Sequence, residues 1–117
     1  MPGTSRARAL GVAGEELAAA WYRDHGYEVV ARNWRCRDGE IDLVVRAGRV
    51  VVFCEVKTRS SDAFGTPAEA VVATKRARIR RLAARWLDEH TGPRPRQIRF
   101  DVAGVVDGRV TMIEGAF

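Results

Sequence analysis

The chain has 117 residues, of which 46% are hydrophobic and 30% charged; this composition predicts one globular domain over residues 1–117 and excludes a disordered chain. The formal net charge of +5 and the pI of about 10.0 favour a polyanionic partner such as a nucleic acid. No apolar run approaches the roughly 18 residues of a membrane helix, and the amino terminus lacks the apolar core of a secretory signal, so the cytoplasm is the expected location.

Residues 1–8 are predicted to form a flexible, basic lead-in, and a helix is predicted from about Ala9 to His25. One side of this helix carries larger apolar residues, namely Leu10, Ala13, Leu17, Ala20 and Trp21. A second side would let the helix approach a sheet closely, because it carries the small residues Gly11, Gly14, Ala18 and Ala19 together with Tyr22. Glu15 lies within that second side, where it either favours the helix dipole or contributes to a site.

Gly26 is expected to end the first helix as a C′ glycine. A strand is predicted over Tyr27–Asn33, and Asp38-Gly39 is predicted to form the turn that follows it. Three arginines gather near this turn and are either phosphate contacts or solvated surface charge: Arg32, Arg35 and Arg37.

The stretch from Gly39 to Arg59 is predicted to be a β-hairpin that turns at Ala47-Gly48, because both arms are rich in β-branched and aromatic residues. Alternate residues of a strand share a face. One face is expected to carry Glu40, Asp42 and Val44 on the first arm and Val51, Phe53, Glu55 and Lys57 on the second. The opposite face is expected to carry Ile41, Leu43 and Val45 with Val50, Val52, Cys54 and Val56. Pairing of the arms can bring Asp42 and Glu55 together, and such charges are costly in an apolar hairpin unless something uses them.

A polar loop over Ser60–Thr66 is expected to lead into a second helix from Pro67 to His90, with Thr66 as its cap and Glu69 closing a capping box. The core stripe of this helix is predicted to be Val71, Val72, Ile79, Leu82, Ala83, Trp86 and Leu87. Lys75 falls within the stripe, and it either reaches out to solvent or points toward the carboxylates. Basic residues flank the stripe and are candidates for a phosphate-backbone track, Arg78, Arg81 and Arg85 on one side and Arg76 and Arg80 on the other.

After a linker over Thr91–Arg96, strands are predicted over Gln97–Val106 and Arg109–Ile113, joined by a turn at Asp107-Gly108. Asp101 interrupts the first of these strands, and a structural ion pair is favoured over a role as an additional acidic ligand. The cysteines, Cys36 and Cys54, are too few and too far apart for a zinc site or a redox motif.

The set of Asp42, Glu55 and Lys57 has the chemistry that phosphodiester hydrolysis needs. Carboxylate oxygens are hard ligands suited to Mg²⁺ or Mn²⁺, and a bound ion lowers the pKa of water and offsets charge on the phosphate. A neighbouring ammonium can position the attacking water or help to deprotonate it. A Glu-x-Lys pattern alone is a weak signal, and it becomes stronger here because it occurs with Asp42, a preceding helix bearing Glu15 and a following basic helix.

Matching stretches in order along nearly the whole chain give a resemblance to the YraN-like family of bacterial proteins and, more broadly, to the PD-(D/E)XK nuclease superfamily. These stretches are Gly14-Glu15, Gly26-Tyr27, Arg32-Asn33, Gly39-Glu40-Ile41-Asp42-Leu43, Phe53-Cys54-Glu55-Val56-Lys57-Thr58-Arg59, Phe64-Gly65, Lys75 and Arg99-Phe100-Asp101-Val102. The resemblance implies an α/β fold with a restriction-endonuclease-like αβββαβ core, similar to archaeal Holliday-junction resolvases. It also implies that Asp42 and Glu55 hold the metal, that Lys57 assists the water and that Glu15 completes the site. Glu40 belongs to the family pattern and is, with Lys75, a possible accessory residue.

The resulting hypothesis is a Mg²⁺- or Mn²⁺-dependent endonuclease that acts on branched, flapped or single-stranded DNA during recombination or repair. Its DNA contacts are expected from Arg32, Arg35, Arg37, Arg59, Arg76, Arg78, Arg80 and Arg81. Two alternatives stay open: a non-catalytic nucleic-acid-binding protein or recombination partner that keeps the fold, and an RNA-directed hydrolase. A homodimer is a further expectation, because cutting two opposed strands needs two sites.

Overall fold

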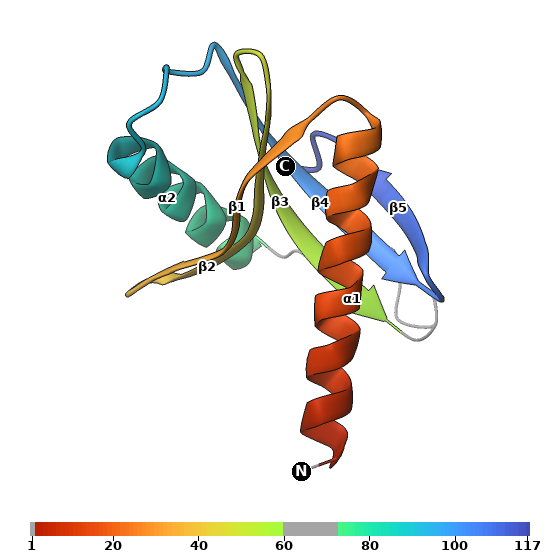
Figure 1. Cartoon of the computed structure of the whole chain (residues 1–117). Helices are drawn as coiled ribbons and strands as arrows, with labels where there is room; N and C mark the ends of the chain where they lie inside the picture. Colours follow the sequence, from red (N-terminus) through yellow and green to blue (C-terminus); the bar gives the residue numbers. More distant parts are fainter. Residues whose placement is uncertain (1, 60–72) are drawn as a thin grey trace.

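The computed structural model describes residues 2–59 and 73–117, with side chains placed over residues 11–59 and 74–117. The elements in chain order are α1 (Pro2–Asp24), β1 (Glu28–Cys36), β2 (Gly39–Ala47), β3 (Val50–Arg59), α2 (Ala73–Glu89), β4 (Gln97–Val106) and β5 (Arg109–Ile113) (Figure 1). The loop, cap and capping box predicted over residues 60–69, and the core positions Val71 and Val72, lie outside the described residues.

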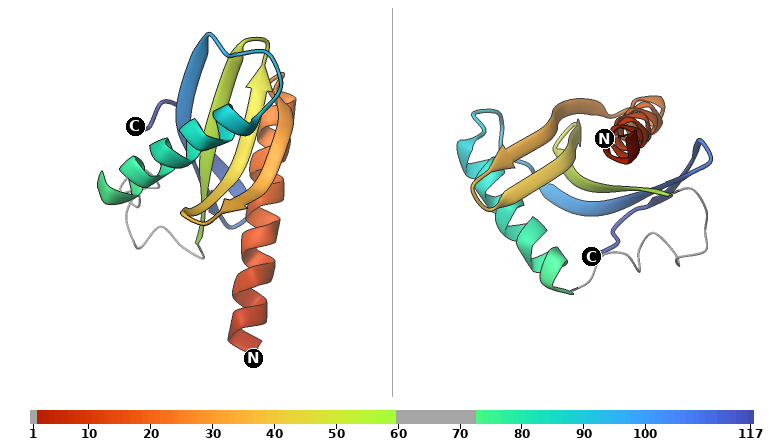
Figure 2. Two further views of the ribbon diagram at one scale, coloured as in Figure 1. Left: turned by 90° about the vertical axis from the view of Figure 1, so that its left-hand side faces the viewer. Right: turned by 90° about the horizontal axis from the view of Figure 1, so that it is seen from below.

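The strands form one five-stranded sheet in the order β1-β2-β3-β4-β5. β3 and β4 run parallel, whereas the other neighbouring pairs are antiparallel. Parallel neighbours need a crossover connection, and α2 lies within it. α1 and α2 cover opposite faces of the sheet (Figure 2). The predicted α/β fold with a mixed sheet between helices, consistent with a restriction-endonuclease-like core, is therefore confirmed, with β5 added at the edge beside β4.

α1 packs on the sheet through its small-residue side, as predicted. Its fully buried residues and their partners from the sheet are Ala18, Ala19, Tyr22, Leu43, Val45, Val52, Cys54 and Ala103. Gly14 permits this close approach, because a Cβ built at that position would lie 1.9 Å from Oγ1 of Thr58 on β3. Leu17, from the side with larger residues, is 36% exposed and does not belong to the core.

α2 covers the other face, and the cluster between them consists of Leu82, Ala83 and Trp86 with Ile41, Val44, Val51 and Phe53, next to a smaller contact of Ile79 with Val102. Ile41 was expected on the opposite face, with Leu43 and Val45, and this expectation was wrong. The β2–β3 ladder ends at the pair Leu43–Cys54, so Ile41 lies beyond it and turns toward α2 with its β1 partner Trp34.

Several predicted boundaries move by a few residues. α1 begins at Pro2 rather than at Ala9, which is compatible with proline at a first helical position, and β1 continues to Cys36 rather than ending at Asn33. Both early turns shift by one residue, to Arg37-Asp38 and Gly48-Arg49. Gly48 has φ of 58°, which suits the first central position of a type II′ turn.

Candidate active site

The polar cluster lies at the end of the sheet where β2 separates from β3. The last paired residues of the two strands are Leu43 and Cys54, so Asp42 and Glu55 are next in line. Oδ2 of Asp42 accepts a hydrogen bond of 2.8 Å from the backbone N–H of Val56, so that its side chain takes the place of a strand partner. Figure 1 shows the β1–β2 hairpin bending away from β3 in this region. Where the strands diverge, Asp42 is half-buried and Glu55 is buried.

Glu55 is the centre of the cluster, and it is only 9% exposed. Its Oε1 lies 2.7 Å from Nζ of Lys75 on α2 and 3.4 Å from Nζ of Lys57, two residues along β3. Lys57 and Lys75 are the only lysines of the chain. The structure therefore brings together the predicted Asp42, Glu55 and Lys57 with Lys75, the predicted possible accessory residue, which makes the shorter of the two lysine contacts.

The surroundings of Asp42 compensate its negative charge poorly, and its pKa is shifted as a result. Burial, reinforced by the nearby carboxylate of Glu55, raises the pKa of Asp42 from 3.8 to about 7, although the hydrogen bond from Val56 opposes the shift. Glu15 and Glu40 raise the same pKa by smaller amounts. All of these carboxylates thus act on Asp42, and a cation placed between them would relieve their repulsion.

The pKa values of Lys57 and Lys75 shift in opposite directions. Burial, together with the hydrogen bond to Lys75, lowers the pKa of Lys57. Burial works against the charge of Lys75, but the hydrogen bonds to Glu55 and Lys57 and the charges of Glu55 and Asp42 together outweigh it and raise the pKa of Lys75. Lys75 therefore holds its proton more strongly and acts as the counter-ion of Glu55. Lys57 loses its proton more readily.

Two further carboxylates raise the pKa of Asp42, and they lie on different elements of the structure. Glu15 follows Gly14 on α1, where the contact of Gly14 with Thr58 holds the helix against the end of β3. Glu40 on β2 forms an ion pair of 3.2 Å with Arg35 on β1. Both are half-buried, and each acts on Asp42 through its charge.

The arginines predicted to contact DNA fall into separate groups. Arg32 is paired with Glu16 of α1 at 2.5 Å and Arg35 with Glu40, so these two already neutralise carboxylates. Arg78 packs beside Gly39 at the β1–β2 turn, and Arg80 lies over the ring of Phe100. The remaining members are Arg37 and Arg81, which are exposed, and Arg59 and Arg76, which are half-buried.

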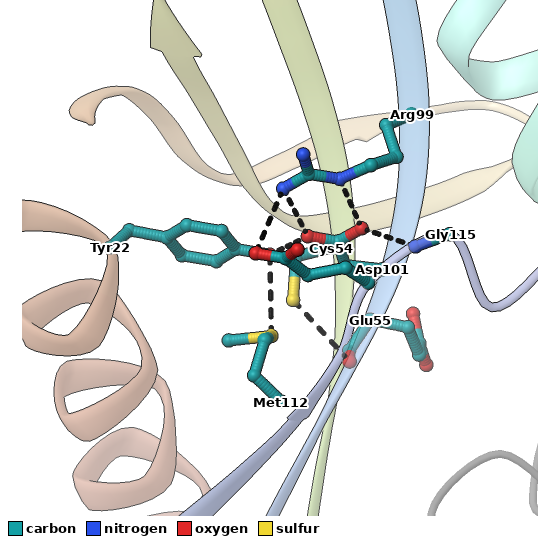
Figure 3. Close-up of polar contacts among 8 residues, drawn as sticks. Tyr22, Cys54, Glu55, Arg99, Asp101, Met112 and Gly115 are labelled. Atoms are coloured by element: carbon teal, nitrogen blue, oxygen red, sulfur yellow. Dashed lines mark hydrogen bonds and ion pairs between the residues drawn. The ribbon is translucent and has the colours of Figure 1, made fainter. Parts of the chain in front are cut away.

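Asp101 belongs to a different cluster, on the α1 side of the sheet (Figure 3). Its carboxylate accepts hydrogen bonds from the Tyr22 hydroxyl at 2.7 Å, from Nε and Nη2 of Arg99 at 2.8 and 3.0 Å, and from the Gly115 N–H at 3.0 Å. Figure 3 shows the side chain of Glu55 pointing away from this cluster. The structural ion pair favoured for Asp101 is thus what the structure contains. The partners of Asp101 were not predicted from the sequence, although Arg99 shares the strand face of Asp101 by its i, i+2 spacing.

Over residues 2–59 and 73–117, no group of three or more His, Cys, Asp or Glu side chains is placed to hold a metal ion. The Asp42–Glu55 pair is thus the candidate, and it suits Mg²⁺ or Mn²⁺, which bind through one or two carboxylates and retain several waters. No helix in the described part of the chain is long and apolar enough to span a membrane.

Together, the fold and this cluster define a class: a mixed α/β protein with a restriction-endonuclease-like core and a carboxylate–lysine cluster where its central strands diverge. The family described as "Uncharacterised protein family UPF0102" matches residues 14–105, and the chain belongs to it. The resemblance to the YraN-like family is thereby confirmed.

Similar proteins come from several organisms. A UPF0102 protein of Nocardia farcinica is 62% identical over 99 residues, which cover 85% of this chain and 77% of that protein. A UPF0102 protein of Beutenbergia cavernae is 57% identical over 101 residues, or 86% and 85% of the two chains. A third, from Frankia casuarinae, is 54% identical over 116 residues, covering 93% of this chain and 96% of its own length.

Proposed function

We propose that the protein is a metal-dependent endonuclease that hydrolyses phosphodiester bonds in DNA. The observation that carries the proposal is the placement of Asp42 beside Glu55 at the diverging strand ends, with a single backbone donor for Asp42 in the described part of the chain. A buried carboxylate pair without full compensation destabilises the fold. Such a pair is typical of a functional site rather than of a structural one.

Asp42 and Glu55 would hold Mg²⁺ or Mn²⁺ by their carboxylate oxygens. When bound, the ion supplies a Lewis acid that offsets charge on the phosphate and lowers the pKa of water. The chain itself supplies the positions of the two carboxylates: the hydrogen bond from Val56 orients Asp42, and the contact with Lys75 orients Glu55. Glu15 adds negative potential from α1 and would complete the acidic surroundings of the ion.

Lys57 has the place of the group that orients the attacking water, because its ammonium lies 3.4 Å from Oε1 of Glu55 on the same strand face. Its lowered pKa favours the exchange of a proton with water. Glu40 would act on Asp42 through its charge, and it also forms an ion pair with Arg35. Arginines on both flanks of α2 would hold the phosphate backbone beside these groups.

The test is a cleavage assay with nicked, flapped, single-stranded and four-way-junction DNA in Mg²⁺, Mn²⁺ or EDTA. Asp42→Asn removes one proposed ligand while preserving the shape of the side chain. Asp107→Asn is the matched control, because Asp107 is an exposed turn residue at φ of 49°, a conformation that asparagine also tolerates.

Metal-dependent cutting by the wild type and by Asp107→Asn, lost in Asp42→Asn and in EDTA, is the expected result. Cutting that survives in Asp42→Asn would contradict the proposal. Tight DNA binding by all three proteins without any cutting would favour the non-catalytic nucleic-acid-binding protein instead.

A further inference from the structure

An aromatic pair lies on the α2 side of the sheet and takes no part in the carboxylate cluster. The rings of Phe100 on β4 and Phe117 stack with centroids 5.3 Å apart and an interplanar angle of 25°. The Ala116 N–H donates a 2.8 Å hydrogen bond to the Phe100 carbonyl, which fixes the segment after β5 beside β4. Both rings pack next to the buried contact of Ile79 with Val102, and each stays half-exposed.

Arginines of α2 lie over these rings. The guanidinium carbon of Arg80 is 5.6 Å from the Phe100 centroid and 6.0 Å from that of Phe117, and that of Arg76 is 5.7 Å from Phe117. A shallow open hollow of about 520 Å³ lies here, lined by Arg76, Ala77, Arg80, Arg81 and Phe117. We refer to Arg76, Arg80, Arg81 and Phe117 as the arginine–phenylalanine shelf. No acidic side chain of the described residues lines it.

The shelf adjoins the candidate active site. Arg76 follows Lys75, whose ammonium contacts Glu55, and Ile79 lies one helical turn further along α2. Ile79 packs on Val102, and Val102 is the partner of Glu55 in the parallel β3–β4 ladder. Glu55 and the shelf therefore lie on the same side of the sheet, at neighbouring positions along α2.

The chemistry of the shelf matches an unpaired nucleotide. An aromatic ring offers a face for base stacking, and planar guanidinium groups both stack on bases and contact phosphates. The bases of an intact duplex are already stacked on each other, so a phenylalanine ring could stack on them only at an end of the duplex or after a base step is unstacked. The guanidinium groups of Arg80 and Arg81 favour an anionic occupant over a cationic one.

We propose that the arginine–phenylalanine shelf binds an unpaired nucleotide next to the scissile phosphate, so that the substrate class is DNA with a single-stranded segment rather than intact duplex. This proposal rests on the proposed nuclease function for the position of the scissile phosphate. Phe117 acts as the stacking surface, and Arg80 acts as both a stacking plane and a phosphate contact.

The test measures binding in EDTA, by fluorescence anisotropy, to an oligo-dT strand and to a blunt duplex. Phe117→Leu keeps an apolar side chain but removes the ring, and Arg80→Lys keeps the charge but removes the plane. Arg109→Ala is the control for charge, because Arg109 is exposed on β5, away from the shelf. Melting temperatures of all variants are compared to verify folding.

We expect Phe117→Leu and Arg80→Lys each to weaken binding to the single strand by at least ~5-fold and to the duplex by less than ~2-fold, as stacking contacts predict. The slope of log affinity against log salt should be unchanged in both variants, since neither removes a charge. Arg109→Ala should affect both DNAs equally.

Equal affinities of wild type and both shelf variants for the single strand, equal losses on both DNAs, or no binding of the single strand by the wild type would overturn the proposal. These outcomes are independent of cleavage. If the protein never cuts DNA but the shelf variants lose single-strand binding selectively, the shelf proposal stands and the nuclease proposal fails. If the protein cuts DNA with metal but the shelf variants show no selective loss of binding, the nuclease proposal stands and the shelf proposal fails.

Discussion

Asp101 on β4 and Asp42 on β2 are both withdrawn from solvent, but their carboxylates are compensated very differently. Asp101 is 0% exposed and accepts hydrogen bonds from Tyr22, Arg99 and the Gly115 backbone. Asp42 accepts one hydrogen bond, from the Val56 N–H, among the described residues, and it faces other carboxylates.

The contrast shows what separates a structural carboxylate from a functional one. Every lone pair of a structural carboxylate is used by the protein, so that burial costs little net free energy. A carboxylate whose charge the fold does not offset raises the free energy of the native state, and a ligand that binds there can recover that free energy. By this criterion, Asp101 joins α1, β4 and the segment after β5, whereas the environment of Asp42 supports the proposed metal site.

The largest expected effect separates the two lysines at Glu55. Lys57→Met should reduce metal-dependent cleavage by about 10²–10⁴-fold, the range expected when a group that transfers a proton is lost. Lys75→Met, the matched control at the same oxygen of Glu55, should cost about 10-fold or less, because the proposal assigns Lys75 to orienting Glu55 and Lys57 to the water. The measurement is the single-turnover rate of cutting, and equal losses in both variants would show that the lysines have no separate roles.

A large effect on stability is expected at Asp101 rather than at Asp42. Asp101→Ala leaves Arg99 and Tyr22 without their acceptor and should lower the free energy of unfolding by about 3–5 kcal/mol. Urea denaturation measures the change, with Asp88→Ala, an exposed position on α2, as the control. A loss below about 1 kcal/mol would remove the distinction between the two carboxylates.

The pH dependence of stability should carry the signature of Asp42. Its pKa is about 7 in the folded protein and 3.8 as the ordinary value, so between these pH values the folded state holds a proton that the unfolded chain has lost. The contribution of Asp42 to the free energy of unfolding should therefore fall as pH rises from about 4 to 7 and stay level above, by about 2 kcal/mol after allowance for solvent screening and coupling to Glu55.

Asp42→Asn should remove this fall in the free energy of unfolding, and at pH 8 it should be more stable than the wild type. Urea denaturation without metal, from about pH 4 to 8, measures both effects. Asp107→Asn should keep the wild-type profile. A wild-type profile in Asp42→Asn would mean that Asp42 is not the destabilising carboxylate.

The smallest effect compares two glycines of α1. Gly11→Ala meets nothing within 4 Å and should stabilise the protein by about 0.5–1 kcal/mol through helix propensity. Gly14→Ala places a Cβ against Thr58 and should destabilise it by about 1 kcal/mol or more. Thermal melts measure both, and similar shifts would show that α1 does not approach β3 closely enough to position Glu15.

Local patterns in the sequence were sufficient for much of the fold. β4, β5 and the Asp107-Gly108 turn appear where residue alternation and turn preference placed them. The central hairpin was harder, because the predicted turn at Ala47-Gly48 would have put Asp42 opposite Phe53. The observed turn at Gly48-Arg49 shifts the pairing by two residues, and Glu55 is then next in line.

The parts that could not be predicted depend on tertiary arrangement. The contact of Lys75 with Glu55 requires the crossover that places α2 over β3, and helix periodicity left its direction open. The stacking of Phe117 on Phe100 joins residues from two segments that no local pattern relates. One signal was available, since the only two lysines of an arginine-rich chain both contact Glu55.

The most direct test of the account is a calorimetric titration of the protein with Mn²⁺. The wild type and Asp107→Asn should bind one ion per chain with equal affinity, and Asp42→Asn and Glu55→Gln should each bind at least ~10-fold more weakly. Absence of binding to the wild type, or equal affinity in all four proteins, would contradict the claim that Asp42 and Glu55 form a cation site.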